Sequence, residues 1–228
     1  MPHAVILPGD LSFRPRMFAD RQAAGHLLAQ ALIHYAGTNA IVLGLPRGGV
    51  PVADEVARTL GATLDVWVSR KLGAPMQAEL GMGAIAEGPA VVLDRSTVRL
   101  LGVNSAQLFA VAQREMAEVR RRVERFRGGR PVPELRDRVV ILVDDGIATG
   151  GTMRAAIRAV KRRRPARLVV AVPVAAQDVV AALRGEVDEV VCLSAPENLY
   201  AIGLWYEDFR QVHDDDVVRI LDKFKSST

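Results

Sequence analysis

Residues 139–154 read VVILVDDGIATGGTMR, and this stretch decides the fold because it joins a strand, an acidic pair, a small-residue loop and a helix start. The run Val139–Val143 is apolar and mostly β-branched, which is typical of a parallel strand buried on both faces. Asp144 and Asp145 follow directly, and residues 153–163 then have the composition of a helix. This order predicts an anion-binding site, because the backbone N–H groups of a glycine loop and of a helix N-terminus attract negative charge.

The acidic pair narrows the kind of ligand. Two carboxylates beside a phosphate would repel it, unless they accept hydrogen bonds from hydroxyl groups or share a hydrated cation. A phosphorylated sugar offers a vicinal diol to the acids and a phosphate to the loop. The segment is not a P-loop, because no Lys follows its glycines, and it is not a dinucleotide fingerprint, because its acids precede the loop.

A second loop of similar character follows the predicted strand at residues 40–45. This loop is Pro46-Arg47-Gly48-Gly49, and it leads into a predicted helix. The next predicted strand, residues 63–69, ends in Arg70 and Lys71. Because the carboxyl ends of parallel strands form the edge where ligands bind, we expect these cations at one edge, where they suit a ligand with two separated phosphate groups.

The remaining segments alternate between strands and helices, which predicts an α/β fold with a doubly wound, mostly parallel sheet. The further predicted helices are residues 18–35, 52–60, 104–126, 178–183 and 214–224, and the further strands are residues 90–93, 168–174 and 189–193. Residues 73–89 are rich in glycine and are interpreted as a hairpin or, in part, a mobile loop. We predict one domain over residues 1–228, with an extended arm at 1–16 and a hood and closing helix at 194–228.

The stretch VVILVDDGIATGGT resembles the signature by which type I phosphoribosyltransferases bind 5-phosphoribosyl 1-pyrophosphate (PRPP). The stretches RKLGAP, VDDGIATGGTMRAA and WYEDF resemble the uncharacterised bacterial phosphoribosyltransferase-like proteins, over most of the chain. The resemblance implies the type I fold, with a flexible loop that closes over the reaction centre and a hood over the sheet edge. It also implies transfer of the 5-phosphoribosyl group to a nitrogen nucleophile, usually a nucleobase, with release of pyrophosphate and with Mg²⁺ arriving with PRPP.

The resemblance assigns roles to individual residues. The catalytic candidates are Asp144 and Asp145 on the ribose hydroxyls, with Arg47 and Lys71 on the pyrophosphate. The substrate-binding candidates are Gly48 and Arg70 for the pyrophosphate, Gly146, Ala148, Thr149, Gly150, Gly151 and Thr152 for the 5-phosphate, and Trp205 for the acceptor. Ala148 stands where the hypoxanthine–guanine enzymes of the family carry an acid, which argues against a 6-oxopurine acceptor.

Two other functions remain open. The chain carries a net charge of +4, and the excess lies in basic clusters at residues 120–130 and 161–167. These clusters would allow a regulator that senses PRPP and binds nucleic acid without catalysis, although solvated helix faces are the more common use of such residues. A hydrolase with Asp144 as nucleophile would need a second acid cluster, which the sequence does not show.

Composition favours an intracellular protein. The chain has one cysteine, its four histidines show no metal-ligand spacing, and it has neither a signal region nor an apolar run of about 18 residues. We therefore expect a cytoplasmic protein without a metal site formed by protein ligands alone. Family members are often dimers, so a homodimer is among the assemblies that the resemblance allows.

Overall fold

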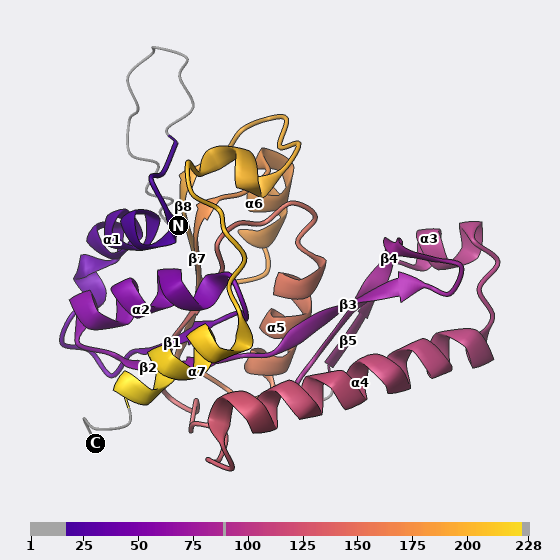
Figure 1. Cartoon of the computed structure of the whole chain (residues 1–228), viewed down its shortest axis with the longest axis horizontal. Coiled ribbons are helices and arrows are strands. Elements are labelled where there is room, and N and C mark those ends of the chain that lie inside the picture. The colour runs from indigo at the N-terminus through magenta and orange to yellow at the C-terminus, as the bar shows by residue number, and fades with distance from the viewer. Residues whose placement is uncertain (1–16, 89, 225–228) are drawn as a thin grey trace.

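The computed structural model describes residues 17–88 and 90–224, and it centres on a five-stranded parallel sheet (Figure 1). The strand order is β2-β1-β6-β7-β8. The strands are β1 (Ile41–Gly44), β2 (Thr63–Val66), β6 (Val139–Val143), β7 (Arg167–Val174) and β8 (Glu189–Ser194). The predicted α/β class with a mostly parallel sheet is confirmed. The predicted arm at residues 1–16 lies outside the described residues.

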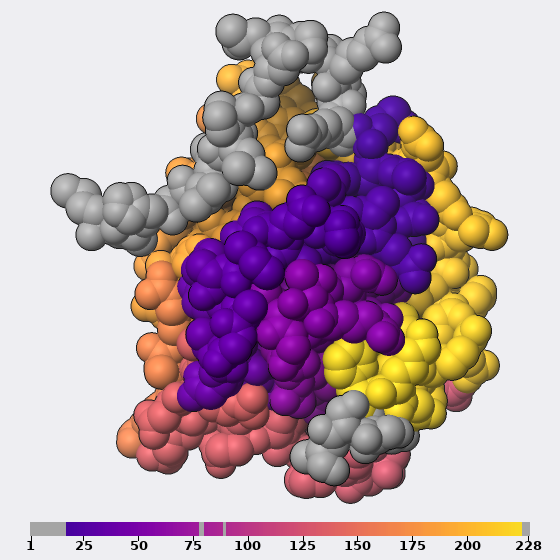
Figure 2. All heavy atoms as spheres, turned by 90° about the vertical axis from the view of Figure 1, so that its left-hand side faces the viewer, coloured from indigo at the N-terminus to yellow at the C-terminus, as the bar shows by residue number. Residues whose placement is uncertain are grey.

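Helices cover both faces of this sheet. One face carries α1 (Arg21–Ala31), α2 (Gly49–Leu60), α4 (Ser105–Arg127) and α7 (Asp214–Lys223), and the other carries α5 (Gly151–Lys161) and α6 (Gln177–Leu183). Successive strand side chains point to opposite faces, so Ile141 packs in the first layer and Leu142 in the second. Figure 2 shows α1 and α2 across the first face, with the C-terminal segment in yellow beside them.

The order of the strands determines where a ligand can bind. From β1 the chain passes through α2 to β2 on one side, whereas β6, β7 and β8 extend the sheet on the other side. The reversal falls between β1 and β6, where Gly44 lies opposite Val143 in the register. In doubly wound sheets, a crevice for ligands opens beyond the carboxyl ends of the two strands at this point.

The predicted elements of the main sheet are largely confirmed. The predicted strand Val139–Val143 coincides with β6, and α4 begins where Asn104 caps it in a reciprocal capping box with Gln107. Helix α5 begins at Gly151, earlier than predicted, so Gly151 and Thr152 belong to its first turn. No helix in the described residues is both long and apolar enough to cross a lipid bilayer.

The segment between β2 and α4 differs from the prediction. The predicted strand at residues 63–69 is confirmed over Thr63–Val66, but β2 ends there and a new strand, β3 (Ser69–Ala74), begins at the predicted last residue. The hairpin interpretation of residues 73–89 is confirmed, since β4 (Gln77–Ala86) pairs antiparallel with β3 and with β5 (Ala90–Leu93), and the partly mobile loop stays a prediction. Gly81 and Gly83 leave gaps in the alternating pattern of β4, so the sequence did not decide between a hairpin and a loop.

This three-stranded sheet lies beside α4 and extends away from the main sheet (Figure 1). A short helix that the sequence analysis missed, α3 (Arg95–Leu100), lies between β5 and α4. Asp94 caps α3 by accepting hydrogen bonds from the backbone N–H groups of Ser96 and Thr97. Its carboxylate replaces the first missing backbone acceptors, which lets so short a helix form.

A buried ionic cluster joins this extension to the main sheet. Arg127, at the end of α4, is only 1% exposed, and its Nε lies 3.2 Å from an oxygen of Asp65 in β2. Its guanidinium also donates to the carboxylate of Glu87, which follows β4, and to the carbonyl oxygen of Val66. The interpretation of residues 120–130 as a solvated face is therefore wrong at Arg127, whose two acidic partners make its burial tolerable.

Candidate functional site

The carboxylates of Asp144 and Asp145 lie directly after β6, at the edge where the strand order reverses. The loop that follows β1 lies against them, because the backbone N–H of Leu45 donates a 2.8 Å hydrogen bond to the carbonyl oxygen of Val143. Gly48 in this loop is so close to Asp145 that an added Cβ would lie 1.9 Å from its Oδ2 atom. The two loops predicted at one edge therefore touch, and glycine is the residue that fits at the contact.

Arg21, the first residue of α1, supplies a cation that the sequence analysis did not identify. Its Nε donates a 2.8 Å hydrogen bond to Asp145 Oδ2, and its Nη1 donates one of 2.8 Å to the carbonyl oxygen of Arg210. The two charged side chains are mostly buried, with 11% of Arg21 and 13% of Asp145 exposed. The guanidinium carbon lies 3.8 Å from the ring centroid of Phe209, in a cation–π contact.

Burial and mutual repulsion make the charged forms of the two acids unfavourable. Burial raises the pKa of Asp144 well above its usual value, and the negative charge of Asp145 raises it further. Burial also raises the pKa of Asp145, although Arg21 opposes this shift. Clustered acids with shifted pKa values are typical of functional sites, because a ligand that donates hydrogen bonds or brings a cation relieves the repulsion.

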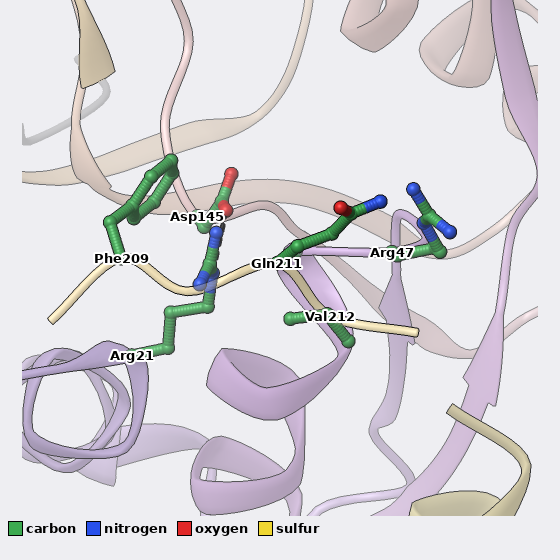
Figure 3. Close-up of a pocket in the computed structure, with 7 residues that line it drawn as sticks. Arg21, Arg47, Asp145, Phe209, Gln211 and Val212 are labelled. Carbon is green, nitrogen blue, oxygen red and sulfur yellow. Dashed lines mark hydrogen bonds and ion pairs between the residues drawn. The ribbon is translucent and has the colours of Figure 1, made fainter. Parts of the chain in front are cut away.

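A pocket of about 410 Å³ opens beside the acid pair (Figure 3). Its lining consists of Arg21, Arg47, Gly48, Asp145, Phe209, Gln211 and Val212. Figure 3 shows Arg21 extending from α1 toward Asp145, with Phe209 beside them and with Gln211 between this group and Arg47. The pocket therefore has a carboxylate end and a cationic end, as a ligand with both hydroxyl and anionic groups requires.

The C-terminal segment, predicted as a hood, is anchored to the site. The hydroxyl of Tyr206 donates a 2.5 Å hydrogen bond to the carbonyl oxygen of Asp145. Burial raises the pKa of Tyr206, so the hydroxyl remains a donor. The Tyr206 ring lies 5.4 Å from that of Phe18, which pairs with this segment through a parallel bridge. This anchor places Phe209 and Gln211 over the pocket.

The predicted 5-phosphate loop joins the acid pair to α5. Gly146 and Gly150 are buried, Ala148 and Thr149 are exposed, and Gly151 and Thr152 form the first turn of α5. Gly150 has a φ of 75°, a left-handed conformation that favours glycine, and as N-cap residue it offers no capping side chain. Backbone donors of the first helical turn thus lie at the loop, as an anion site at a helix N-terminus requires.

Arg70 and Lys71 were predicted at the carboxyl end of a strand of the main sheet, and this prediction is wrong. Both belong to β3, because the chain leaves the main sheet at Val66. The Arg70 Nε donates a 2.7 Å hydrogen bond to Glu115 of α4. The stem of Lys71 crosses the neighbouring strand, where an added Cβ at Gly81 would lie 2.9 Å from Lys71 Cε. In the part of the chain that the structure describes, neither Arg70 nor Lys71 belongs to the pocket lining.

Trp205 lies at the end of the short helix η2 (Ile202–Trp205), outside the pocket lining. Its carbonyl oxygen accepts a 2.8 Å hydrogen bond from the N–H of Phe18, and its side chain packs against the Phe18 and Tyr206 cluster. Its surroundings are those of a packing residue. The aromatic ring at the pocket is instead that of Phe209.

Three residues of the pocket were not predicted from the sequence, namely Arg21, Phe209 and Gln211. One signal was available for Arg21, since it directly follows Asp20, the N-cap of α1. The positive end of the helix dipole repels a cation in the first turn, so a cation at this position indicates an anionic partner elsewhere in the fold. Phe209 and Gln211 lie in an irregular segment, where no periodic pattern indicates the direction of a side chain.

The described residues contain no group of three or more His, Cys, Asp and Glu side chains placed to hold a metal ion. The paired carboxylates of Asp144 and Asp145 nevertheless fit Mg²⁺, which retains water molecules and takes most of its remaining ligands from substrate phosphates. The raised pKa values of both acids agree with a site that gains from an added cation.

The contact of Gly48 with Asp145 gives a testable prediction. In Gly48→Ala, the new methyl group would overlap the Asp145 carboxylate and force it away from Arg21. We expect the free energy of unfolding to fall by about 1–3 kcal/mol, as at other overpacked sites. We also expect the affinity for phosphorylated ligands to fall about tenfold or more. Thermal denaturation and calorimetric titration would measure the two effects.

Gly185→Ala is the matched control, because a Cβ there would make an ordinary contact of 3.6 Å with the Ala182 carbonyl oxygen. This variant should retain both stability and binding. Equal behaviour of the Gly48 and Gly185 variants would mean that the close approach has no functional importance.

Comparisons with known proteins agree with this geometry. Residues 18–203 match the family model described as the phosphoribosyl transferase domain. The Mycobacterium tuberculosis H37Rv protein Rv0571c, provisionally named a phosphoribosyl transferase, is 47% identical over 208 residues, which is 91% of this chain and 47% of that protein. This chain therefore spans about half the length of that relative.

Solved structures show the same fold. The crystal structure of TT1426 from Thermus thermophilus has a TM-score of 0.76 and 46% sequence identity, over 91% of this chain and 99% of that one. The AQ2163 protein from Aquifex aeolicus has a TM-score of 0.51 at 12% identity, over 80% of this chain and 78% of that one, and this likeness concerns the fold alone. The family model covers the main sheet, the acid pair and both loops, and the chain belongs to the phosphoribosyl transferase domain family.

Proposed function

We propose that this protein transfers the 5-phosphoribosyl group of PRPP to a nitrogen nucleophile, most plainly a nucleobase, and releases pyrophosphate. The observation that carries the proposal is the contact between two loops across the reversal of strand order. The acid pair after β6 meets the Arg47–Gly48 turn after β1, and the N-terminus of α5 lies at the end of the same acidic loop. This arrangement supports a diol site between two anion sites, which is the pattern of groups along PRPP.

In this proposal the acids after β6 hold the sugar. The carboxylates of Asp144 and Asp145 accept hydrogen bonds from the ribose hydroxyls, with Arg21 fixing the orientation of Asp145 through their 2.8 Å contact. The loop from Ala148 to Thr152 holds the 5-phosphate with backbone N–H groups. Holding both ends of the ribose leaves C1 in the pocket, between the acid pair and Arg47.

The reaction replaces one bond at C1 with another. The nitrogen lone pair of the acceptor forms the new C1–N bond, the C1–O bond breaks, and its electron pair leaves with pyrophosphate. The proton of the acceptor nitrogen passes to water. Positioning and electrostatics can supply most of the catalysis, because the developing charge is shared between the sugar and the leaving group.

Mg²⁺ is part of the proposal, and when bound it would neutralise charge on the pyrophosphate. Asp144 and Asp145 are the protein groups that would hold it, together with oxygens of PRPP and water. Arg47 adds a fixed cation at the other end of the pocket, where the leaving group would gain negative charge.

Arg47→Ala tests the pyrophosphate end of the pocket. We expect turnover and PRPP affinity to fall about ten- to a hundredfold, the usual loss for a charge-assisted contact with phosphate, whereas ribose 5-phosphate should bind almost as well as before. Calorimetric titration with each ligand separates the two ends of the site. Arg158→Ala, on the exposed face of α5, is the control for loss of an arginine. Equal losses of affinity for PRPP and for ribose 5-phosphate would contradict the assignment of Arg47 to pyrophosphate binding.

The function itself is tested by calorimetric titration with PRPP and Mg²⁺, followed by measurement of pyrophosphate release across a panel of nucleobases. Release that depends on the base would establish the enzyme and identify its acceptor. Binding without release from any base would favour the alternative of a PRPP-sensing regulator. Absence of PRPP binding would contradict the proposal.

A further inference from the structure

Three arginines surround one carboxylate beside the pocket, and the proposed reaction does not use this carboxylate. Asp214, the first residue of α7, has its Oδ1 atom 3.5 Å from Arg47 Nη1. On its other side, Asp214 Oδ2 lies 3.5 Å from Arg125 Nε and 3.9 Å from Arg121 Nη2, both on α4. Figure 1 shows α7 lying along α4 at this place.

Asp214 is not needed to cap its helix. The capping box of α7 is formed by His213 and Asp216, whose carboxylate accepts a 2.9 Å hydrogen bond from the backbone N–H of His213. The Oδ1 atom of Asp214 is buried, and among the described residues it accepts no hydrogen bond. The side chain is only 18% exposed, so this oxygen is held near Arg47 without the directional bond that would lock the two together.

We propose that Asp214 is the resting counterion of Arg47 and that it competes with pyrophosphate for the Arg47 guanidinium. This inference rests on the proposed function, because it takes Arg47 as the pyrophosphate-binding residue. Asp214 does not contact substrate in this proposal. It is a positioning residue that acts through Arg47.

The surroundings of Asp214 keep the free-energy cost low when pyrophosphate replaces Asp214 as the partner of Arg47. When Arg47 turns to a phosphate group, Asp214 still has Arg121 and Arg125 within 4 Å, so no buried charge is left without a partner. No hydrogen bond to Oδ1 has to break, because none of the described residues donates one. A guanidinium bound to a carboxylate by two hydrogen bonds would have to break both, and the exchange would cost more free energy.

The exchange has a consequence for turnover. Because the Asp214 carboxylate competes for Arg47, it lowers the affinity for pyrophosphate and thereby favours release of this product. Product release limits the rate of many enzymes, so a weaker hold can raise turnover. The negative charge would then act at the end of the cycle, after the C1–O bond has broken.

The test compares Asp214→Asn with Asp215→Asn. Both changes remove one negative charge from the first turn of α7, but Asp215 is 82% exposed and pairs with Arg125 instead of Arg47. We expect Asp214→Asn to bind inorganic pyrophosphate with Mg²⁺ about two- to fivefold more tightly, the range for a partly exposed ion pair, and to release it more slowly. Asp215→Asn should match the unaltered protein, and ribose 5-phosphate affinity should not change in either variant.

The remaining outcomes overturn the inference. Weaker pyrophosphate binding by Asp214→Asn would show that Asp214 orients Arg47 for its ligand, and unchanged binding would show that it has no influence on Arg47. Asp214→Glu keeps the charge and should restore the original affinity, which separates the effect of charge from a loss of folding. If the unaltered protein binds PRPP and pyrophosphate and Asp214→Asn fails to bind more tightly, only this inference falls. If the unaltered protein binds neither, the proposed function falls with it.

Discussion

Replacing both acids, Asp144→Asn with Asp145→Asn, is expected to lower PRPP affinity at least about a hundredfold, because under the proposed function each carboxylate would lose charge-assisted hydrogen bonds to the ribose hydroxyls. Asp145 lines the pocket, and Asp144 lies directly before it, where burial and the charge of Asp145 raise its pKa. An asparagine has nearly the same shape but accepts hydrogen bonds more weakly and does not attract a cation. Calorimetric titration with PRPP and Mg²⁺ measures the loss.

The folded structure should survive this double change. The Asp144 Oδ1 atom accepts a 2.9 Å hydrogen bond from the backbone N–H of Asp145, and an asparagine oxygen can accept the same bond. Arg21 loses its ion pair but keeps its 2.8 Å hydrogen bond to the carbonyl oxygen of Arg210 and its contact with the Phe209 ring. The change also removes two buried negative charges and the repulsion between them, which raise the pKa of Asp144. Asp178→Asn, at an exposed position in α6, is a suitable control. An unaltered affinity for PRPP in a folded double variant would contradict the assignment of the acid pair.

Arg127→Leu is expected to lower the free energy of unfolding by about 3–5 kcal/mol, because it leaves two buried carboxylates without their cation. Asp65 and Glu87 are 7% and 7% exposed, and both bind the Arg127 guanidinium. Burial already raises the pKa of Glu87, and Arg127 opposes that shift. Denaturant unfolding followed by circular dichroism measures the change.

Two further variants show whether the orphaned charge is the cause. Arg120→Leu removes an exposed arginine from the same helix and should alter stability by less than about 0.5 kcal/mol. Combining Arg127→Leu with Glu87→Gln removes one of the stranded negative charges and should restore part of the lost stability. A stability loss in Arg127→Leu no larger than that in Arg120→Leu would show that the cluster does not hold the extension to the sheet.

Sequence reasoning succeeded where a feature is local. The strand at Val139–Val143 shows itself by a run of β-branched residues, and the start of α4 by a capping asparagine. It left residues 73–89 open between a hairpin and a mobile loop, because Gly81 and Gly83 in β4 remove the side chains whose alternation reveals a strand. It failed at Arg127, since a basic cluster looks the same whether all of its members are solvated or one is buried.

The sequence by itself determined the α/β class, the two glycine loops and the acidic pair, because each depends on neighbours a few residues apart. Only the tertiary structure decided which distant groups meet. Arg21 reaches Asp145 across 124 positions of the chain, and Asp214 reaches Arg47 because α7 returns to the edge of β1. Such pairs follow from strand order and helix packing, which bring together residues whose local patterns contain no information about each other. The sequence therefore indicated the chemistry of each loop, whereas the ion-pair partners of these loops, Arg21 for Asp145 and Asp214 for Arg47, were determined by the fold.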